Sequence, residues 1–487
     1  MESTSIRSAG VAILMALCLE VTAYGAPKPQ PGIEPPKEAP EYEAAPRPGD
    51  GVNMALAVEK LQNGFDPPRP LLIWAIGSSF TNFLGNGDPL IEAIRRRWPD
   101  APEIVYKKMV GNSTSYHFTR GWARHRVIPD QPDVVLIYNF GRTEELEKLI
   151  VDLRRSTTAD VLVPTLHWCV PHKRVWPDPD ARNGHQDPAA LRAMCRRHGV
   201  EFVESRRELT EYMLANHLDV EDLLVDSVHQ SPYAAKMINR NIARHFHRAD
   251  EPAYDPRSRE RRVEAEGASP VEAGPGDWAP SEGGTAIAAT EQGSAISVAF
   301  TGNRIDLVGW RSPRGGRADV WIDGRPADRA AVFYAGYVQP DRANAPAPPN
   351  PPRDRAPHGV SLGANLVPQS WTITMTDDQG AYELVGSVTG PDGEGSAFEP
   401  FTSNSGQIAI DPELWRGAKT NRRGDRFTFE VFRSAVGEVD FAGDERAKFR
   451  VRLVANLPNG PHRVKLVARG DGSVTIDAFD VFEPPGK

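Results

Sequence analysis

The sequence has few cysteines and none of the common metal-binding motifs. Its 487 residues include three cysteines, and Cys18 lies in a hydrophobic N-terminal segment. The other two, Cys169 and Cys195, could pair in an oxidising compartment or remain free and buried. No CxxC, HExxH or EF-hand pattern occurs, and His245 and His247 suit the end of a predicted helix, where histidine favours the helix dipole. We therefore expect no metal and no cofactor.

The sequence also lacks a surplus of positive charge and a long hydrophobic run. A net charge of -8 gives no electrostatic support for a nucleic-acid partner. The apolar run "AGVAILMALCL" is too short to span a membrane. Arg7 before this run and Ala23 and Gly25 after it indicate that residues 1–26 are a signal peptide. A lipid anchor on Cys18 would lack the small residue that normally precedes the modified cysteine. We expect a secreted or periplasmic protein without a transmembrane span.

The next part of the sequence alternates apolar and amphipathic segments. Residues 27–50 are rich in proline and charge, which is typical of an extended linker. Within residues 51–250, "LLIWAIG", "EIVYKKM", "DVVLIYNFG" and "DVLVPTLHW" have the length and hydrophobicity of strands buried on both faces. Between them, "DPLIEAIRRRW" and "EELEKLIVDLRR" place apolar residues at helical spacing. This alternation predicts a three-layer α/β domain, a parallel sheet flanked by helices.

Residues 251–487 have a different pattern, in which helical periodicity disappears. Segments such as "SAISVAFTGNRIDLVGWRS", "RADVWIDGRPA" and "SVTIDAFDVFEP" predict the strands of a β-sandwich and resemble a galactose-binding-like jelly roll. A proline-rich stretch begins an expected insertion around residues 340–440. Within it, Phe398, Phe401 and Trp415 could form a carbohydrate platform, and burial in the sandwich is the alternative that we favour.

Polar residues gather where strands of the predicted α/β domain end. Ser78 and Ser79 follow Gly77 at the end of the first strand, and Asp226 and His229 precede the last helix. Active sites of parallel sheets form beyond the carboxyl ends of the strands. The three-residue spacing would let Asp226 orient the His229 imidazole, which could then accept the proton of a serine hydroxyl. The alternative is an ordinary strand–helix turn without chemistry.

These segments resemble conserved blocks of the SGNH (GDSL-like) hydrolases. "IGSSFT" is similar to the first block, which implies that Ser79 is the nucleophile and that Ser78 replaces the usual aspartate. "GNSTS" resembles the second block, which implies that Gly111 and Ser79 lend backbone N–H groups to the oxyanion hole. "DSVH" matches the fifth block and implies that Asp226 and His229 complete a triad. The resemblance implies serine hydrolase chemistry.

The third block of the resemblance departs from the family pattern. When "FGRTE" is laid on the family's Gly-x-Asn-Asp, Thr143 takes the place of the asparagine whose amide donates to the oxyanion. Thr143 could donate through its hydroxyl, and Asn139 and Asn112 are the alternatives. His167 and Trp168, after the fourth predicted strand, could line a substrate cleft or have a structural role.

The resemblance covers about residues 70 to 248 and leads to an expected function. It implies an exported serine esterase that deacetylates a polysaccharide or another acylated carbohydrate without a cofactor. The sandwich-like segment supports a carbohydrate partner, because such domains often bind sugars, although fold-level analogy alone does not establish binding. Two alternatives stay open. One is a carbohydrate-binding protein with a degenerate hydrolase domain, which the altered third block would suit, and the other is an acyltransferase with the same triad.

Overall fold

The structure is a computed structural model, and it describes residues 34–36, 39–111, 121, 123–266, 271–336, 338–340, 355–415 and 417–486. The predicted signal peptide, the start of the predicted linker, Asn112 and the first part of the expected insertion lie outside the described residues. Within the described ranges, no helix is both long enough and apolar enough to cross a membrane.

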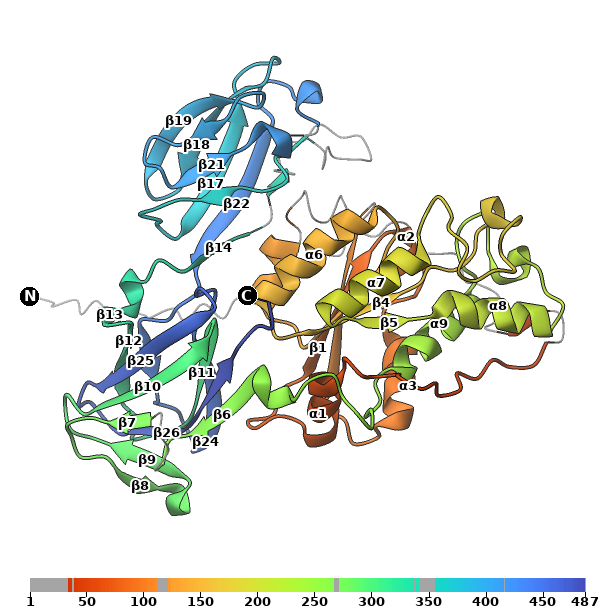
Figure 1. The fold of residues 1–487 in the computed structure, drawn as a ribbon. Coiled ribbons are helices and arrows are strands. Elements are labelled where there is room, and N and C mark those ends of the chain that lie inside the picture. The colour runs from red at the N-terminus through yellow and green to blue at the C-terminus, as the bar shows by residue number, and fades with distance from the viewer. Residues whose placement is uncertain are drawn as a thin grey trace, which may run out of the picture.

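A parallel sheet forms the centre of the N-terminal half (Figure 1). Its five strands lie in the order β2-β1-β3-β4-β5, and every adjacent pair is parallel. Their bounds are β1 (Leu71–Gly77), β2 (Ile104–Val110), β3 (Val134–Tyr138), β4 (Asp160–Pro164) and β5 (Glu201–Val203). The α/β prediction is therefore confirmed.

Helices cover both faces of this sheet. Their bounds are α1 (Ala55–Asn63), α2 (Ser79–Asn82), α3 (Asp88–Arg97), α5 (Ile128–Asp130), α6 (Thr143–Ser156), α7 (Pro188–His198), α8 (Ser205–Ala215) and α9 (Pro232–Arg244). Helices α1, α3, α8 and α9 pack on the face that carries Leu71 and Ile73. Helices α6 and α7 pack on the face that carries Trp74 and Ile76. Successive residues of a strand point to opposite faces, so β1 is apolar throughout because both of its faces are buried.

The C-terminal half contains a β-sandwich of two antiparallel sheets. The first has the order β13-β12-β25-β10-β7 with β23 beside β12, and the second has the order β24-β11-β26-β9-β8 with β6 beside β26. Their apolar faces share one core, to which Val298, Leu307 and Phe479 belong. The bounds are β6 (Glu260–Glu264), β7 (Val271–Ala273), β8 (Ala279–Ser281), β9 (Ala286–Ala289), β10 (Ala295–Gly302), β11 (Arg304–Arg311), β12 (Arg317–Ile322), β13 (Arg325–Pro326), β23 (Glu438–Asp440), β24 (Ala447–Val454), β25 (Gly460–Ala468) and β26 (Val474–Phe482).

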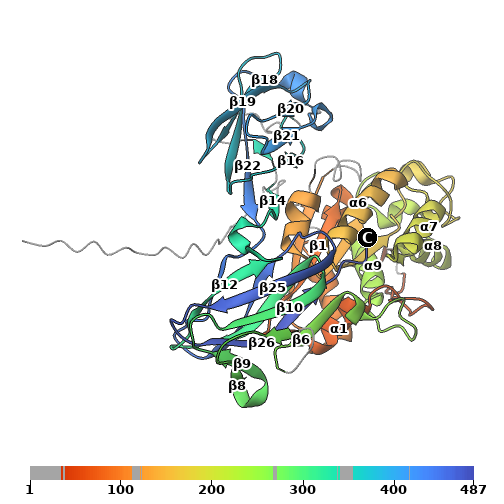
Figure 2. The same cartoon turned by 60° about the vertical axis from the view of Figure 1, so that its left-hand side comes forward.

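Further strands between β13 and β23 form a separate unit (Figure 2). They are β14 (Phe333–Ala335), β15 (Gln339–Pro340), β16 (Ser361–Leu362), β17 (Gln369–Met375), β18 (Ala381–Gly386), β19 (Gly390–Ser396), β20 (Phe401–Thr402), β21 (Ile408–Ile410) and β22 (Arg426–Arg433). Phe401 and Trp415 are buried in the core of this unit, where both rings contact Tyr382, and only Phe398 is exposed. A platform of these three aromatic side chains is therefore wrong, because two of them hold the core together.

The sandwich meets the α/β half at the amino-terminal edge of the parallel sheet. Asp133 immediately precedes β3, and both Lys60 and Arg69 lie 2.8 Å from its carboxylate. Asp160, the first residue of β4, pairs with Arg259 from the segment that leads into β6. Burial would raise the pKa of the Asp133 carboxyl, but the Lys60 and Arg69 cations hold it well below its usual range. The opposite edge, where the strands end, carries the residues of the candidate site.

Gly77 permits the tight turn between β1 and α2. A Cβ atom at this position would lie 1.8 Å from Thr81 Oγ1 and 2.3 Å from the Tyr138 carbonyl oxygen. Because Thr81 donates to that carbonyl at 2.6 Å, neither group can move away freely. We expect Gly77→Ala to lower the free energy of unfolding by about 1–3 kcal/mol through overpacking. Denaturant unfolding measures this change. Gly460→Ala is the control, since a Cβ there meets no atom within 4 Å, and an equal loss in both variants would contradict the explanation.

Candidate active site

The turn after β1 separates the roles of its two serines. Ser78 is buried, and its hydroxyl accepts a hydrogen bond from the Phe80 N–H at 3.3 Å, which makes it the N-cap of α2. Ser79 is the first residue of α2 and is exposed. The turn therefore presents the Ser79 side chain to solvent at the carboxyl edge of the sheet and uses Ser78 as structure.

Asp226 and His229 form a hydrogen-bonded pair in the loop before α9. The distance from His229 Nδ1 to Asp226 Oδ2 is 2.8 Å. The other carboxylate oxygen accepts the backbone N–H groups of Val228 and His229, each at 2.8 Å. Burial opposes ionisation of Asp226, but these hydrogen bonds bring its pKa below the usual range. A carboxylate at Nδ1 keeps the proton there and leaves Nε2 as the basic nitrogen.

The His229 ring lies on the short helix that Ser79 begins. It stacks on Phe83, with ring centroids 4.2 Å apart and an interplanar angle of 12°, and its edge contacts Phe80. The next residue, Gln230, donates from its side-chain amide to the Phe80 carbonyl at 2.7 Å. The structure thus brings the Asp226–His229 loop against α2, and so into the neighbourhood of Ser79.

His167 is a buried link between the sheet and this loop. Its Nε2 lies 2.8 Å from the Val228 carbonyl oxygen and its Nδ1 lies 2.7 Å from the Tyr138 hydroxyl. The carbonyl can only accept, so Nε2 carries the proton and Nδ1 accepts from Tyr138. Burial lowers the pKa of His167 to about 3, which keeps the ring neutral. Of the two roles left open for His167, these contacts support the structural one.

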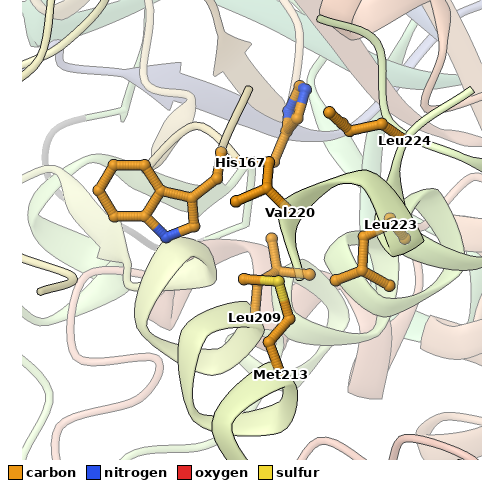
Figure 3. A pocket seen from close by; sticks show the side chains of 8 residues that line it. His167, Leu209, Met213, Val220, Leu223 and Leu224 are labelled. Atoms are coloured by element: carbon orange, nitrogen blue, oxygen red, sulfur yellow. The ribbon is translucent and has the colours of Figure 1, made fainter. Parts of the chain in front are cut away.

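A small cavity lies behind His167 and is too small for a substrate (Figure 3). Its volume is about 10 Å³, which is the room needed by a single water molecule. The lining is almost entirely apolar and comprises His167, Trp168, Leu209, Met213, Val220, Leu223, Leu224 and Ala234. The Trp168 indole N–H donates to Thr210 inside the fold, which also indicates a structural role.

Asn139 carries an unused donor at the carboxyl edge of the sheet. It follows Tyr138, which is paired with Gly77 in the register of β1 and β3. Its side chain is 4% exposed, and its Oδ1 accepts the Phe140 N–H at 3.0 Å. That bond identifies the other amide atom as Nδ2, which is buried and has no hydrogen-bond partner among the described residues. Buried donors are normally paired, so this one is suited to a ligand oxygen.

The other expected oxyanion donors are placed less favourably. The Gly111 N–H donates to the Gly77 carbonyl at 2.7 Å and extends the ladder between β1 and β2. Because this N–H is already hydrogen-bonded, it does not face an oxyanion as the resemblance had led us to expect. Thr143 is half-buried at the first position of α6, four residues beyond Asn139. Asn112 lies outside the described residues. Among the expected donors, the structure therefore favours Asn139.

The two cysteines and the two histidines near the end of α9 have structural surroundings. Cys169 and Cys195 are both free and buried, so they do not pair, and burial raises the pKa of each thiol to about 12. His245 directly follows α9 and bonds through Nδ1 to Glu201 at 2.5 Å, whereas His247 is exposed. The two histidines therefore occupy the helix end as expected.

No family model matches the sequence, and no curated protein matches it. Structural comparison finds a two-domain esterase active on acetylated mannans, with 10% identity and a TM-score of 0.32 over 90% of this chain and 96% of that chain. A family two carbohydrate esterase from Cellvibrio japonicus has 10% identity and a TM-score of 0.20 over 46% and 33%. A protein described as a GDSL-like lipase from Parabacteroides merdae has 14% identity and a TM-score of 0.27 over 37% and 97%. The TM-scores are too low to support a conclusion about activity, which has to rest on the site residues.

The unpaired amide of Asn139 leads to a kinetic prediction. A donor that acts on the oxyanion only in the transition state affects kcat more than KM. We expect Asn139→Ala to lower kcat for an activated acetate ester by about 10²–10³-fold with little change in KM. Thr143→Val is the control and should leave kcat within about twofold. The opposite pattern would identify Thr143 as the donor.

The neutral, buried state of His167 predicts a pH dependence of stability. The folded protein takes up this proton near pH 3, whereas the unfolded chain does so near 6.5. The contribution of His167 is therefore complete above pH 6.5 and is lost as the pH falls toward 3. We expect wild type to lose up to about 1.4 kcal/mol per pH unit more than His167→Gln in this window. Urea unfolding measures both proteins, and parallel stability curves would contradict the prediction.

Proposed function

We propose that this protein is an exported serine esterase that removes acyl groups, acetyl in the first place, from a carbohydrate. The observation that carries the proposal is the Asp226–His229 pair held against the helix that begins with the exposed Ser79. A nucleophile, a base and a group that orients the base are the parts that acyl transfer requires. The sequence motifs that resemble the SGNH hydrolases support the same chemistry.

The proposed reaction begins with attack of Ser79 Oγ on the ester carbonyl carbon while His229 Nε2 accepts the hydroxyl proton. Asp226 holds the opposite ring nitrogen and stabilises the imidazolium. The oxyanion accepts hydrogen bonds from Asn139 Nδ2 and from the Ser79 N–H, which has no intrahelical acceptor at the start of α2. The carbohydrate hydroxyl leaves with the proton from His229. Water then attacks the acyl-enzyme with His229 again as the base, and the acid is released.

The domain boundaries remain part of this proposal. We assign residues 51–250 to the hydrolase domain and residues 251–487 to an accessory β-sandwich with an insertion around 340–440. Separate hydrophobic clusters in the α/β half, the sandwich and the insertion support the division. The sandwich packs at the edge of the sheet opposite Ser79, so it leaves the carboxyl edge accessible to a polymeric substrate. Export rests on the sequence of residues 1–26.

The different environments of Ser78 and Ser79 provide the test. We expect Ser79→Ala to abolish both hydrolysis of an acetylated aryl ester and labelling by a fluorophosphonate probe. Ser78→Ala should keep most of both, since it removes an N-cap worth about 1 kcal/mol and no reacting group. Mass spectrometry of the labelled peptide locates the adduct, and an adduct on Ser78 would show that the assignment of the nucleophile is wrong.

The same proteins distinguish the alternatives to hydrolysis. A wild-type protein that hydrolyses no activated ester but is retarded on glycan affinity gels would favour a carbohydrate-binding protein with a degenerate site. Transfer of the acyl group to an added sugar, in place of water, would favour an acyltransferase. A panel of acetylated plant and algal polysaccharides then defines the substrate.

A further inference from the structure

A cluster of metal-ligating side chains lies beside the candidate active site and has no role in the proposed reaction. Cys169, His172 and His185 come from the long connection between β4 and α7, and one potential ligand atom from each lies within 4.8 Å of the others. Cys169 and His172 are buried, whereas His185 is half-buried and leaves an entry path. We propose that these three residues bind a divalent transition metal ion, Zn²⁺ in the first place, with a fourth position open.

The types of ligand atom in the cluster determine which metal ions it can bind. One thiolate and two imidazoles suit Zn²⁺ and related d-block ions, whereas Ca²⁺ and Mg²⁺ require oxygen ligands. In a tetrahedral zinc site the bond lengths of about 2.0–2.3 Å place the ligand atoms roughly 3.3–3.8 Å apart. The ligand atoms, which lie up to 4.8 Å apart, therefore have to move about 1 Å closer together when the metal ion binds. Side-chain rotation in a connection without regular strands can supply a movement of this size.

The two histidines differ in how readily they can bind a metal ion. His185 Nδ1 is buried and has no hydrogen-bond partner among the described residues. His172 Nδ1 accepts the Cys169 N–H at 3.1 Å, so ligation through this atom has to replace that hydrogen bond. The two rings lie edge to face with centroids 4.9 Å apart. Buried ring nitrogens in a purely structural cluster are normally paired, and a metal ion would satisfy the His185 nitrogen.

The protonation states agree with this geometry. Each imidazole has to supply a lone pair: His185 offers the unpaired Nδ1, and His172 offers its Nδ1 once that atom releases the Cys169 N–H. Burial keeps the Cys169 thiol protonated in the absence of metal. Binding therefore forms a metal–sulfur bond, breaks the S–H bond and releases one proton to solvent.

The cluster is connected to the Asp226–His229 loop. The Cys169 thiol donates to the Val228 carbonyl at 3.2 Å, and the Val170 N–H donates to the Ser227 carbonyl at 2.9 Å. His185 also contacts the ring of Phe80 in α2. Metal binding would break the Cys169–Val228 hydrogen bond, because a thiolate has no proton to donate, and would leave the Val170–Ser227 bond and the His185–Phe80 contact as the links to the loop and to α2. The proposal stands independently of the esterase function, because the ligands are not the proposed triad residues.

The test uses the full chain, stripped of metal with a chelator and titrated with Co²⁺ as a spectroscopic probe. We expect one equivalent to bind with a thiolate-to-Co²⁺ charge-transfer band and the strong ligand-field absorption of four-coordinate cobalt. Zn²⁺ should displace the cobalt and raise Tm. Cys169→Ala should lose the charge-transfer band. His185→Asn should weaken Zn²⁺ binding by more than the roughly 10–100-fold that follows loss of a group outside the ligand set.

Cys195→Ala is the matched control, since Cys195 is equally buried but lies in α7. It should keep the charge-transfer band and the stoichiometry of wild type. The proposal is overturned if wild type shows no charge-transfer band, if the band persists in Cys169→Ala, or if His185→Asn binds Zn²⁺ as tightly as wild type. Because His185 is half-buried, His185→Asn keeps the test informative even where a change at Cys169 prevents folding.

Discussion

The buried imidazole of His167 is the contact on which the geometry of the candidate site depends. The Asp226–His229 loop belongs to no helix or strand, so its position has to come from tertiary contacts. His167 receives a hydrogen bond from Tyr138 at the end of β3 and donates one to the Val228 carbonyl in the loop. Since the ring stays neutral, it can accept on one side and donate on the other. The sheet thereby positions the loop that carries the proposed base, His229.

The other parts of the site are held at the same edge of the sheet by short-range packing. The close approach of Gly77 to the Tyr138 carbonyl places α2 directly over the end of β3. Ser79 and Asn139 follow the two neighbouring strands, which brings the proposed nucleophile and the proposed amide donor to one edge. The β-sandwich is joined to the sheet at the other edge, where Lys60 pairs with both Asp133 and Glu260 and where Arg259 pairs with Asp160. The proposed catalytic residues and the domain attachment therefore lie at opposite ends of the same strands.

The connection between β4 and α7 carries the proposed metal ligands and also contacts the candidate active site. Cys169 and Val170 bond to the backbone of the Asp226–His229 loop, while His185 lies against Phe80 of α2. A metal ion held by Cys169, His172 and His185 would cross-link the two ends of this connection. Metal occupancy is thus expected to affect the stability of the site more directly than its chemistry.

Features of the fold that depend on local pattern could be predicted from the sequence. Apolar runs and helical spacing predicted the α/β half and most of the sandwich strands, although α1 and α8 were not identified. The spacing of Asp226 and His229 predicted their hydrogen bond because residues three apart in a turn can meet. The unpaired amide that favours Asn139 over Thr143 as the proposed donor, and the approach of His185 to Cys169, appear only in the folded chain. Both features depend on burial and on contacts between residues far apart in the sequence. Such contacts produce no periodic pattern of residues from which they could be predicted.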